Sequence, residues 1–542
     1  MLGKIIKNLK NYQIRQDYIS FNHNIFKPNK TSGKLVLIEF NAFHESHVCQ
    51  SLFSNFLAKK YDLNIVGYFN YCILSAPLNQ TIFQKIKWNL GKFFNYKYHA
   101  IYKSFGSKYV IRPKINKDKK EFATKIANLI FTKIKNKKDI LKIKLEGIYI
   151  GDLIYDTYLK SNQLAFVNIK DRNFYSMLVD FINLFYFWKN FFTENDVHSI
   201  IGVHSVYSYG LPMRVAISKK INAYTINSRE LNKINKKNYF PSTNFLEFPK
   251  KFKKLNRTNQ KIGLEMAKEI LNRRVLGKGG ITNHLISNIS SFHSKKEKRL
   301  IEKNNKIKIL ICTRNIFDAT HVFGNLLFVD NYDWLVFLGN ISKKTDYDWY
   351  LKTHINLDGK FKFYQPNSNK LIFDIVKKFP KIKILPNNYS HKQIIDEKID
   401  FVLTQHGSVG FEYPMFNIPV INASLNNPQV GYDFNYHPKN IKEYRNLIKN
   451  LKKVKKNLKI NKNKIYEFYY MRHLFQDRKW LFSKPDEMIK KIGGWDNMMK
   501  EQFYDYFIKN VNKSKINQIY NSFEKFILSD YQSLSIEDSN KI

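Results

Sequence analysis

Apolar runs recur along the first half of the chain in an order that predicts an α/β unit. A short apolar run leads into a polar loop, a helical segment that ends near Lys60, and a second apolar run. This order is typical of a strand, a crossover helix and a parallel strand. A further helix is expected at Leu211–Lys220, between two more apolar runs. The strands expected here are Leu35–Phe40, Leu63–Phe69, Ser199–Val203 and Ala223–Ile226.

The second half repeats this order after a charged, weakly periodic stretch, 251–305, which is expected to connect two domains. After Ile465, aromatic residues mixed with charge predict helices. We therefore predict two Rossmann-like halves with a C-terminal helical extension. The elements expected in the second half are strands at Lys308–Cys312, Tyr347–Leu351, Ile382–Leu385, Phe401–Leu403 and Val420–Asn422, and a helix at Asn331–Leu338.

The length agrees with this division, because a chain of 542 residues is too long for a single hydrophobic core. A hydrophobic share of 44% excludes a chain that is disordered throughout. The boundaries that we predict are an N-terminal basic segment at 1–33, a first Rossmann-like domain at 34–250, a connection at 251–305, a second Rossmann-like domain at 306–465 and a helical extension at 466–542.

The formal net charge of +47 has three explanations. Lysines occur throughout the chain beside many Asn and Ile residues, which is typical of a coding bias towards AT-rich codons. A functional explanation is attraction to an anionic membrane surface or to phosphorylated substrates. Binding of nucleic acid is the third explanation, although no basic strip interleaved with aromatic residues matches a known module.

Cysteine usage and hydropathy indicate the compartment. Cys49, Cys72 and Cys312 show no metal-ligand spacing, and a reducing environment is the natural interpretation. The sequence shows no secretory signal and no apolar stretch of the roughly 18 residues that span a bilayer. We expect a cytoplasmic protein. If its acceptor is a lipid-linked glycan, we expect it to associate peripherally with the inner face of the plasma membrane.

The first residues of the chain carry an amphipathic pattern. Leu2, Ile5 or Ile6, Leu9 and Tyr12 fall at helical spacing, and lysines at positions 4, 7 and 10 lie between them. A short basic helix that lies on a membrane has this pattern. A first helix packed on its domain has the same pattern, and the sequence leaves both interpretations open.

The segment Phe401–Asn422, FVLTQHGSVGFEYPMFNIPVIN, carries the strongest chemical signal. An apolar strand leads into a polar turn with two glycines, a helix begins there, and a second apolar strand follows. At the carboxyl end of a parallel strand, Gly407 and Gly410 would let backbone amides approach a diphosphate. The Ser408 hydroxyl would donate to a phosphate oxygen, and Glu412, about one turn into the helix, would bind ribose hydroxyls.

The residues HGSVGFEYPMFNIPVI resemble the donor-binding segment of GT-B glycosyltransferases, in which a glycine-rich turn precedes a glutamate and a proline follows it. The stretches TRNIFDATHVFGNLLFVDNYDWL and YDWYLKTH are similar to bacterial capsule and lipopolysaccharide biosynthesis proteins. The resemblance covers roughly residues 305–445 and is vaguer in GIYIGDLIYDTYLK and HSVYSYGLPMRVA of the first half. Many relatives have His-Pro after the lysine, whereas His354 precedes Ile355 here, so the resemblance does not extend to a donor such as CMP-Kdo.

The resemblance implies an α/β fold of the GT-B-like class, with two Rossmann-like domains facing a cleft. The first domain would bind the acceptor, and the second would bind the nucleotide sugar. Arg314 and Lys352 would pair with the donor diphosphate in place of a metal ion, and His354 and His406 would donate to phosphate or sugar oxygens. The donor-binding residues expected are Arg314, Asp318, His321, Lys352, His354, His406, Gly407, Ser408, Gly410 and Glu412.

The catalytic base is expected in the first domain, in the polar loop after its first strand. An inverting transferase needs a group that takes the proton of the acceptor hydroxyl, and a His or a carboxylate in such a loop qualifies. We predict His44 or Glu45 in this role. Asp152, Asp156 and His204 are further candidates.

The sequence thus predicts a metal-independent glycosyltransferase that moves a sugar from a nucleotide-activated donor to a surface-polysaccharide or lipid-linked glycan acceptor. It would need no cofactor, and its partners would be the nucleotide sugar, the acceptor and an anionic membrane surface, with no specific nucleic acid. A polyol-phosphate transferase or a nucleotide-sugar epimerase on the same fold is the enzymatic alternative. A basic nucleic-acid-binding protein is the alternative from another class.

Overall fold

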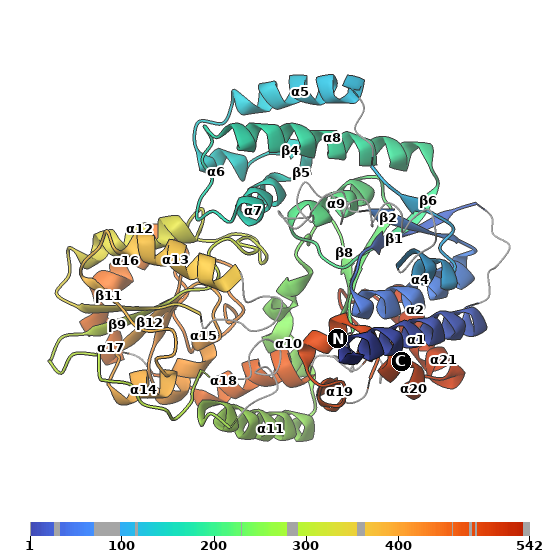
Figure 1. Cartoon of the computed structure of the whole chain (residues 1–542). Coiled ribbons are helices and arrows are strands. Elements are labelled where there is room, and N and C mark those ends of the chain that lie inside the picture. Colours follow the sequence, from blue (N-terminus) through green and yellow to red (C-terminus); the bar gives the residue numbers. More distant parts are fainter. Residues whose placement is uncertain are drawn as a thin grey trace. The chain divides into compact units, whose positions relative to one another are not determined.

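The chain divides into two compact units (Figure 1). Unit 1 comprises Met1–Ser161, Asn168–Pro241 and Asp477–Ile542, and unit 2 comprises Asn162–Val167 and Ser242–Gln476. The structure is a computed structural model that describes residues 2–26, 33–69, 98–113, 117–228, 230–278, 291–354, 364–457, 459–475, 480–482 and 485–534.

Unit 1 is built on a six-stranded sheet with the order β3-β2-β1-β6-β7-β8. All neighbouring strands are parallel except β7 and β8, which pair antiparallel. All six residues of β1 are buried, as expected for a strand that is covered on both faces. The strands are β1 (Leu35–Phe40), β2 (Asn64–Phe69), β3 (Val110–Ile111), β6 (Val197–Gly202), β7 (Asn222–Ile226) and β8 (Leu231–Ile234).

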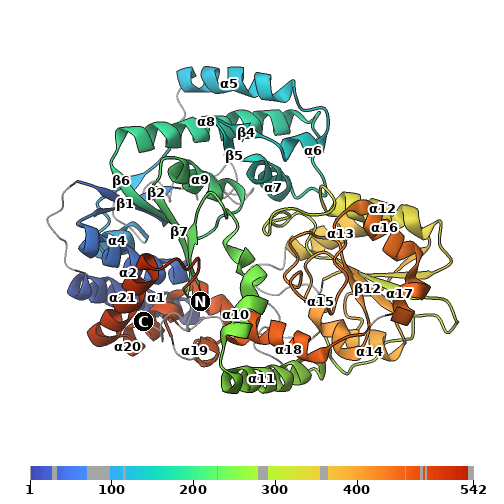
Figure 2. The same ribbon diagram turned by 180° about the vertical axis from the view of Figure 1, so that it is seen from behind.

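Helices cover both faces of this sheet (Figures 1 and 2). On one side lie α8 (Arg172–Glu194) and α9 (Gly210–Ser218), and on the other lies α2 (His44–Tyr61). Around α2 lie α1 (Leu2–Ile25), α20 (Glu501–Asn510) and α21 (Lys513–Leu528). Further elements of unit 1 are α4 (Tyr98–Ser104), α5 (Lys117–Phe131), α6 (Lys137–Ile140), α7 (Gly151–Asn162), α19 (Pro485–Lys491) and the hairpin of β4 (Lys144–Leu145) and β5 (Ile148–Tyr149).

Unit 2 has a five-stranded, fully parallel sheet with the order β11-β10-β9-β12-β13. The first strand in sequence, β9, lies in the centre, and the chain builds outward from it in both directions, as in one half of a Rossmann fold. The strands are β9 (Lys308–Cys312), β10 (Asp348–Lys352), β11 (Ile382–Ile384), β12 (Phe401–Thr404) and β13 (Val420–Asn422). The helices that follow them are α12 (Asn331–Ser342), α13 (Tyr364–Val376), α14 (His391–Asp396), α15 (Val409–Glu412), α16 (Ile441–Lys449) and α17 (Leu451–Asn457).

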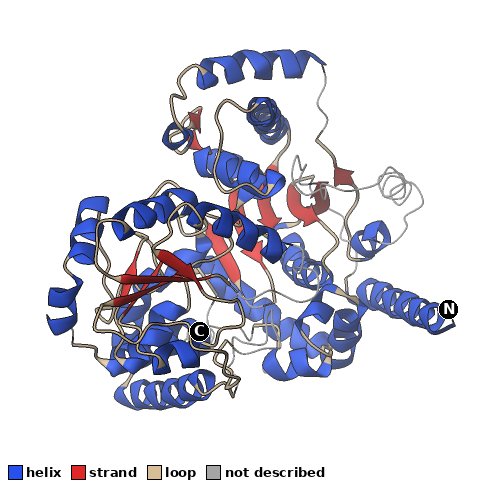
Figure 3. Cartoon of the chain, turned by 60° about the vertical axis from the view of Figure 1, so that its left-hand side comes forward, coloured by secondary structure: helices blue, strands red, loops and turns tan. Residues whose placement is uncertain are grey.

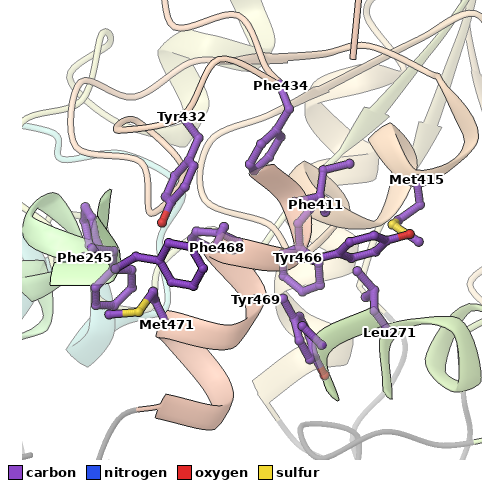
Figure 4. Close-up of a cluster of buried hydrophobic side chains, with 14 of the residues drawn as sticks. Phe245, Leu271, Phe411, Met415, Tyr432, Phe434, Tyr466, Phe468, Tyr469 and Met471 are labelled. Atoms are coloured by element: carbon purple, nitrogen blue, oxygen red, sulfur yellow. The ribbon is translucent and has the colours of Figure 1, made fainter. Parts of the chain in front are cut away.

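The stretch expected to connect two domains is largely part of the core of unit 2. There α10 (Phe248–Lys254) and α11 (Arg257–Val275) pack against α18 (Lys462–Tyr469). Figure 4 shows the buried cluster that they form with the segment after the Gly407 turn. The aromatic and aliphatic side chains labelled there include Phe245, Leu271, Phe411, Met415, Phe468 and Tyr469. Ile262 and Met266 of α11 are exposed, so the apolar residues of this helix are not confined to its buried face, which explains its weak periodicity in the sequence.

The segment expected as a C-terminal extension is divided between the two units. Residues 466–476 belong to unit 2, and residues 477–542 belong to unit 1. The amphipathic helices α20 and α21 bury Phe503, Tyr504 and Phe523 against the helices of unit 1. The end of the chain is therefore an integral layer of the first unit.

The predicted strands are all present, with boundaries shifted by at most two residues, and the prediction of two Rossmann-like α/β halves is confirmed. The chain is mixed α/β, and Figure 3 shows the strands of each sheet surrounded by helices. Within the described ranges, none of the helices combines the length and the apolar character that a bilayer crossing requires.

Candidate functional site

The carboxyl ends of β9, β10 and β12 bring together three groups that the sequence singled out. Because β9 and β12 are neighbours but not consecutive, the strand order reverses between them. In open α/β sheets, ligands bind outside the carboxyl ends of the strands at such a switch point. Arg314 follows β9 by two residues, Lys352 ends β10, and His406 follows β12 by two residues. We refer to this region as the β9–β12 edge.

The guanidinium of Arg314 is held in place from two sides. Its Nη2 donates to the carbonyl oxygens of Asp318, at 2.5 Å, and Ala319, at 3.2 Å. Its Nη1 lies 3.2 Å from Nδ1 of His406. Arg314 itself remains partly exposed, so it presents a fixed positive charge at the β9–β12 edge.

His406 acts as a support for Arg314. An arginine is always protonated, so Nδ1 of His406 must accept the hydrogen bond from Nη1. Its Nε2 then carries the proton and donates to Oγ of Ser424, at 2.7 Å. Burial and the charge of Arg314 lower the pKa of His406 well below its usual value, which keeps the ring neutral. Both ring nitrogens are occupied by contacts that orient Arg314, and the expected donation from His406 to a phosphate or sugar oxygen stays a prediction.

The Gly407 turn lies beside this pair. The Gly407 amide donates to Oγ1 of Thr404 at 3.2 Å, and a Cβ at position 407 would lie 2.8 Å from the same oxygen. Ser408 is exposed, and among the described residues the amides of Ser408 and Val409 donate to no partner. Successive amides of this kind form a concave site for an anion. The turn therefore offers two donors and a hydroxyl next to Arg314.

Lys352 ends its strand at the same edge but lies deeper. Its side chain is buried, and Nζ donates to the carbonyl oxygen of Asn387 at 2.7 Å. Burial lowers the pKa of Lys352 to about 8. Two residues later, the exposed His354 accepts a hydrogen bond at its backbone oxygen from Asn369, at 3.3 Å. Of the two predicted cations, Arg314 is thus the one that is accessible.

The loop after β9 uses the other two expected residues for its own structure. His321 is buried, and its Nε2 donates to the carbonyl oxygen of Val329 at 3.0 Å. Asp318 contributes its carbonyl oxygen to the clamp on Arg314. Both residues shape the loop that orients the arginine, a role that their positions in the sequence did not reveal.

Two expected ligand-binding residues are packed inside unit 2. A Cβ at Gly410 would lie 2.7 Å from Oε1 of Gln429, so a larger residue there would displace the Gln429 side chain. The Glu412 side chain is 1% exposed and accepts from Nε of Arg274 at 2.7 Å, and Arg274 lies over the ring of Phe411. Glu412 is thus held in a buried ion pair with α11, and its expected contact with ribose hydroxyls stays a prediction.

In unit 1, the two expected catalytic residues are buried at the start of α2. Glu45 accepts hydrogen bonds from the backbone amide of Ser228, at 2.9 Å, and from its hydroxyl. Nε2 of His44 lies 3.6 Å from the carboxylate of Glu501, from α20. Burial would raise the pKa of Glu501, but its contacts with His44 and its own backbone amide and the charges of His44 and Arg15 together lower this pKa to about 2. Either residue would have to leave its partner to act as a base, and their catalytic role stays a prediction.

Of the three further catalytic candidates in unit 1, two are buried and one is exposed. Asp152 forms a buried, bidentate ion pair with Arg214, with both N–O distances at 2.6 Å, and Asp156 is buried in the same helix. His204, in the loop after β6, is exposed and lies near the ring of Tyr209. Asp152 is thus held by Arg214, whereas His204 lies at the carboxyl edge of its sheet, and the catalytic role of each stays a prediction.

Sequence reasoning missed Glu39, the one acidic residue within the apolar run of β1. β1 and β6 flank the switch point of the unit-1 sheet, and the amide of Val203, just after β6, donates to Oε2 of Glu39 at 2.8 Å. The side chain is 2% exposed, and burial raises the pKa of Glu39 to about 7. A lone glutamate in the run LVLIEF was the available signal.

Glu39 should make stability depend on pH. Its pKa is higher in the fold than the reference value of 4.5, so the unfolded chain releases the proton first. The free energy of unfolding should therefore fall between pH 4.5 and about 7, by up to about 3 kcal/mol. Relative to Glu39→Gln, the wild type should lose stability over this range in urea titrations at several pH values. The exposed Glu121→Gln is the control, and parallel curves for wild type and Glu39→Gln would contradict the assignment.

The Asp-x-Asp triplet of unit 2 lies at the other edge of the sheet. Asp348 begins β10 and accepts from Nδ2 of Asn304 at 2.8 Å, and Asp346 pairs with Lys306. Lys352, four residues after Asp348, is at the opposite end of the same strand. These carboxylates are therefore remote from the β9–β12 edge.

Comparisons with known proteins complete this description. No protein-family model and no curated protein matches the sequence. Among solved structures, the chain is similar to the β-Kdo 2,4-transferase KpsC of Thermosulfurimonas dismutans, at 12% identity over 51% of this chain and 79% of that chain, with a TM-score of 0.32. It is also similar to the UDP-GlcNAc 2-epimerase of Neisseria meningitidis, at 10% identity over 81% of this chain and 96% of that chain, with a TM-score of 0.21. The UDP-GlcNAc 2-epimerase of Methanocaldococcus jannaschii is similar at 13% identity over 81% of this chain and 97% of that chain, with a TM-score of 0.22. These names fall within the two enzyme classes that the sequence predicted, but TM-scores below 0.5 leave the function to be argued from the site.

Proposed function

We propose that the chain is a glycosyltransferase that moves a sugar from a nucleotide-activated donor to a surface-polysaccharide or lipid-linked glycan acceptor. The observation that carries this proposal is the place of Arg314 at the switch point of a parallel sheet, where it contacts His406, which precedes the turn with the unpaired Ser408 and Val409 amides. A fixed guanidinium beside unpaired amides suits the diphosphate of such a donor. The resemblance of the surrounding segment to GT-B donor sites supports the same assignment.

The chemistry proposed at this edge is stabilisation of a leaving group. As the bond to the sugar breaks, negative charge develops on the nucleotide phosphate, and a donor that is already oriented stabilises it without reorganisation. Arg314 would supply the charge, and the Gly407 turn would supply the amide donors. We propose a reaction without a metal ion, because the Asp346 and Asp348 carboxylates lie at the far edge of the sheet.

A nucleotide screen tests the binding half of this proposal. UDP, GDP or CMP should raise the melting temperature of the wild type, since a ligand at about 100 times its dissociation constant stabilises by about 2.7 kcal/mol. Arg314→Ala should abolish this shift. Arg445→Ala is a matched control, because Arg445 is exposed in the same unit over the ring of Phe337. A wild type that responds to none of these nucleotides and their sugars would contradict the proposal.

Product analysis with a labelled nucleotide sugar separates transfer from epimerisation. Both reactions need a held nucleotide diphosphate, so binding alone does not distinguish them. A transferase moves the label to the acceptor and releases the nucleotide, whereas an epimerase keeps the activated sugar and changes its configuration.

We further propose that a lipid-linked acceptor places the enzyme at the inner face of the membrane.

A further inference from the structure

The first three turns of α1 carry an apolar stripe that unit 1 leaves uncovered. Ile5, Ile6, Leu9 and Tyr12 are between 50% and 64% exposed. Successive side chains of a helix are rotated by about 100°, so Ile5, Leu9 and Tyr12 project in nearly the same direction, with Ile6 at their side. Large apolar side chains that are exposed together mark an interaction surface.

The same helix packs on unit 1 through its opposite face. Ile14 and Tyr18 are buried, and by helical rotation they lie about half a turn from the centre of the stripe. Tyr18 stacks on Tyr504 of α20 with ring centroids 4.2 Å apart, and Arg15 forms an ion pair with Glu501 at 2.9 Å. These contacts come from the second half of α1. Figure 3 shows the N-terminal turns extending beyond the helices on which α1 packs.

The charge on the face opposite the stripe has one sign. Lys4, Lys7 and Lys10 alternate with the apolar residues, and Lys7 and Lys10 are exposed. The first acidic residue of the chain is Asp17, a full turn and more beyond Tyr12. A helix with an apolar stripe on one face and lysines on the other has the composition of helices that lie in the interface of anionic bilayers.

We propose that the first half of α1, residues 2–12, docks on an anionic lipid surface. The four apolar side chains would enter the head-group region, and Lys7 and Lys10, on the polar face, would be attracted to the anionic head groups. The stripe is about 10 Å long, at a rise of 1.5 Å per residue. Its four residues are far fewer than the roughly 20–30 residues per partner of a stable protein interface, which favours lipid over a second copy of the chain.

The proposed surface belongs to unit 1 and uses no residue of the β9–β12 edge. Docking therefore does not depend on the reaction proposed above. A variant that loses membrane binding should keep its response to nucleotides, and Arg314→Ala should keep its membrane binding. The two proposals can fail separately.

Co-sedimentation of the full chain with vesicles tests the docking. The wild type should bind phosphatidylcholine vesicles that contain phosphatidylserine, and pure phosphatidylcholine about tenfold or more weakly. Leu9→Gln and Ile5→Gln should each weaken binding by about tenfold or more, and Lys7→Gln by about fivefold. Leu528→Gln is the matched control, because Leu528 is an exposed leucine of the same unit, at 73%, outside α1.

Other results would overturn the proposal. A wild type that ignores phosphatidylserine vesicles at low salt contradicts it, as does binding that Leu9→Gln and Ile5→Gln leave unchanged. If these variants instead reduce the size of an oligomer in sedimentation velocity and leave vesicle binding intact, the stripe is an interface between copies. Melting curves like that of the wild type show that the variants are folded, since both side chains are exposed.

Discussion

Arg314→Ala is expected to lower turnover of the nucleotide-sugar donor by about a hundredfold to a thousandfold, the loss seen when one oriented donor to transition-state charge is removed. The guanidinium is fixed by the Asp318 and Ala319 carbonyl oxygens and by His406, so its charge is in place before the sugar leaves. Turnover should be measured by release of the nucleotide, with excess EDTA present throughout.

Two variants sharpen this experiment. Arg314→Lys keeps the charge but loses the planar fork that meets His406 and the two carbonyls, so it should recover only part of the activity. Arg445→Ala should turn over like the wild type. Normal turnover of Arg314→Ala would remove this residue from the site, and loss of wild-type activity in EDTA would contradict a metal-independent reaction.

The fold could be predicted from the sequence because its strands are covered on both faces. Such strands read as continuous apolar runs, as in LVLIEF for β1 and KILIC for β9, and these two strands were predicted to the residue. The two-residue β3 has too few positions for a pattern, and β8 has the mixed sequence LNKI, so neither was predicted. The hydrophobic pattern of a segment therefore predicts a strand only where the strand is long and most of its residues are apolar.

Partners that lie far apart in sequence could not be predicted in this way. Glu45 was recognised as a polar residue after a strand, but its partner Ser228 is 183 positions away. The carboxylate beside His44 comes from α20, in the segment expected as a separate extension. The amphipathic pattern of α20 shows that it is a helix with one buried face, but it does not show which unit that face covers.

At the β9–β12 edge, the positions of two residues could be predicted from local sequence, whereas a contact between distant residues could not. The positions of Arg314 and His406 at strand ends followed from the apolar runs and the connectivity of parallel sheets. The support that Ser424 gives His406 did not follow, because it depends on how the chain returns after β13. Local sequence thus located the charged group, and tertiary structure decides that the histidine beside it orients the arginine.

Glu412→Ala is expected to destabilise unit 2 by about 3 to 5 kcal/mol, because it would leave Arg274 buried without its counter-charge. Arg274 is 7% exposed and Glu412 is 1% exposed, so water cannot replace the lost carboxylate. The pair joins α11 to the turn that follows β12, so its loss should also loosen the Gly407 turn. Urea unfolding, followed by a probe in unit 2, measures the change.

A double variant separates this ion pair from a ribose contact. Arg274→Met with Glu412→Leu removes both charges and keeps apolar volume among Phe411 and Leu271, so it should be more stable than Glu412→Ala alone. A glutamate that served only to bind ribose would give a different pattern: Glu412→Ala would unfold like the wild type, nucleotide affinity would fall, and the second substitution would restore nothing. Because the two roles predict opposite changes in stability and affinity, measuring both on the same variants decides between them.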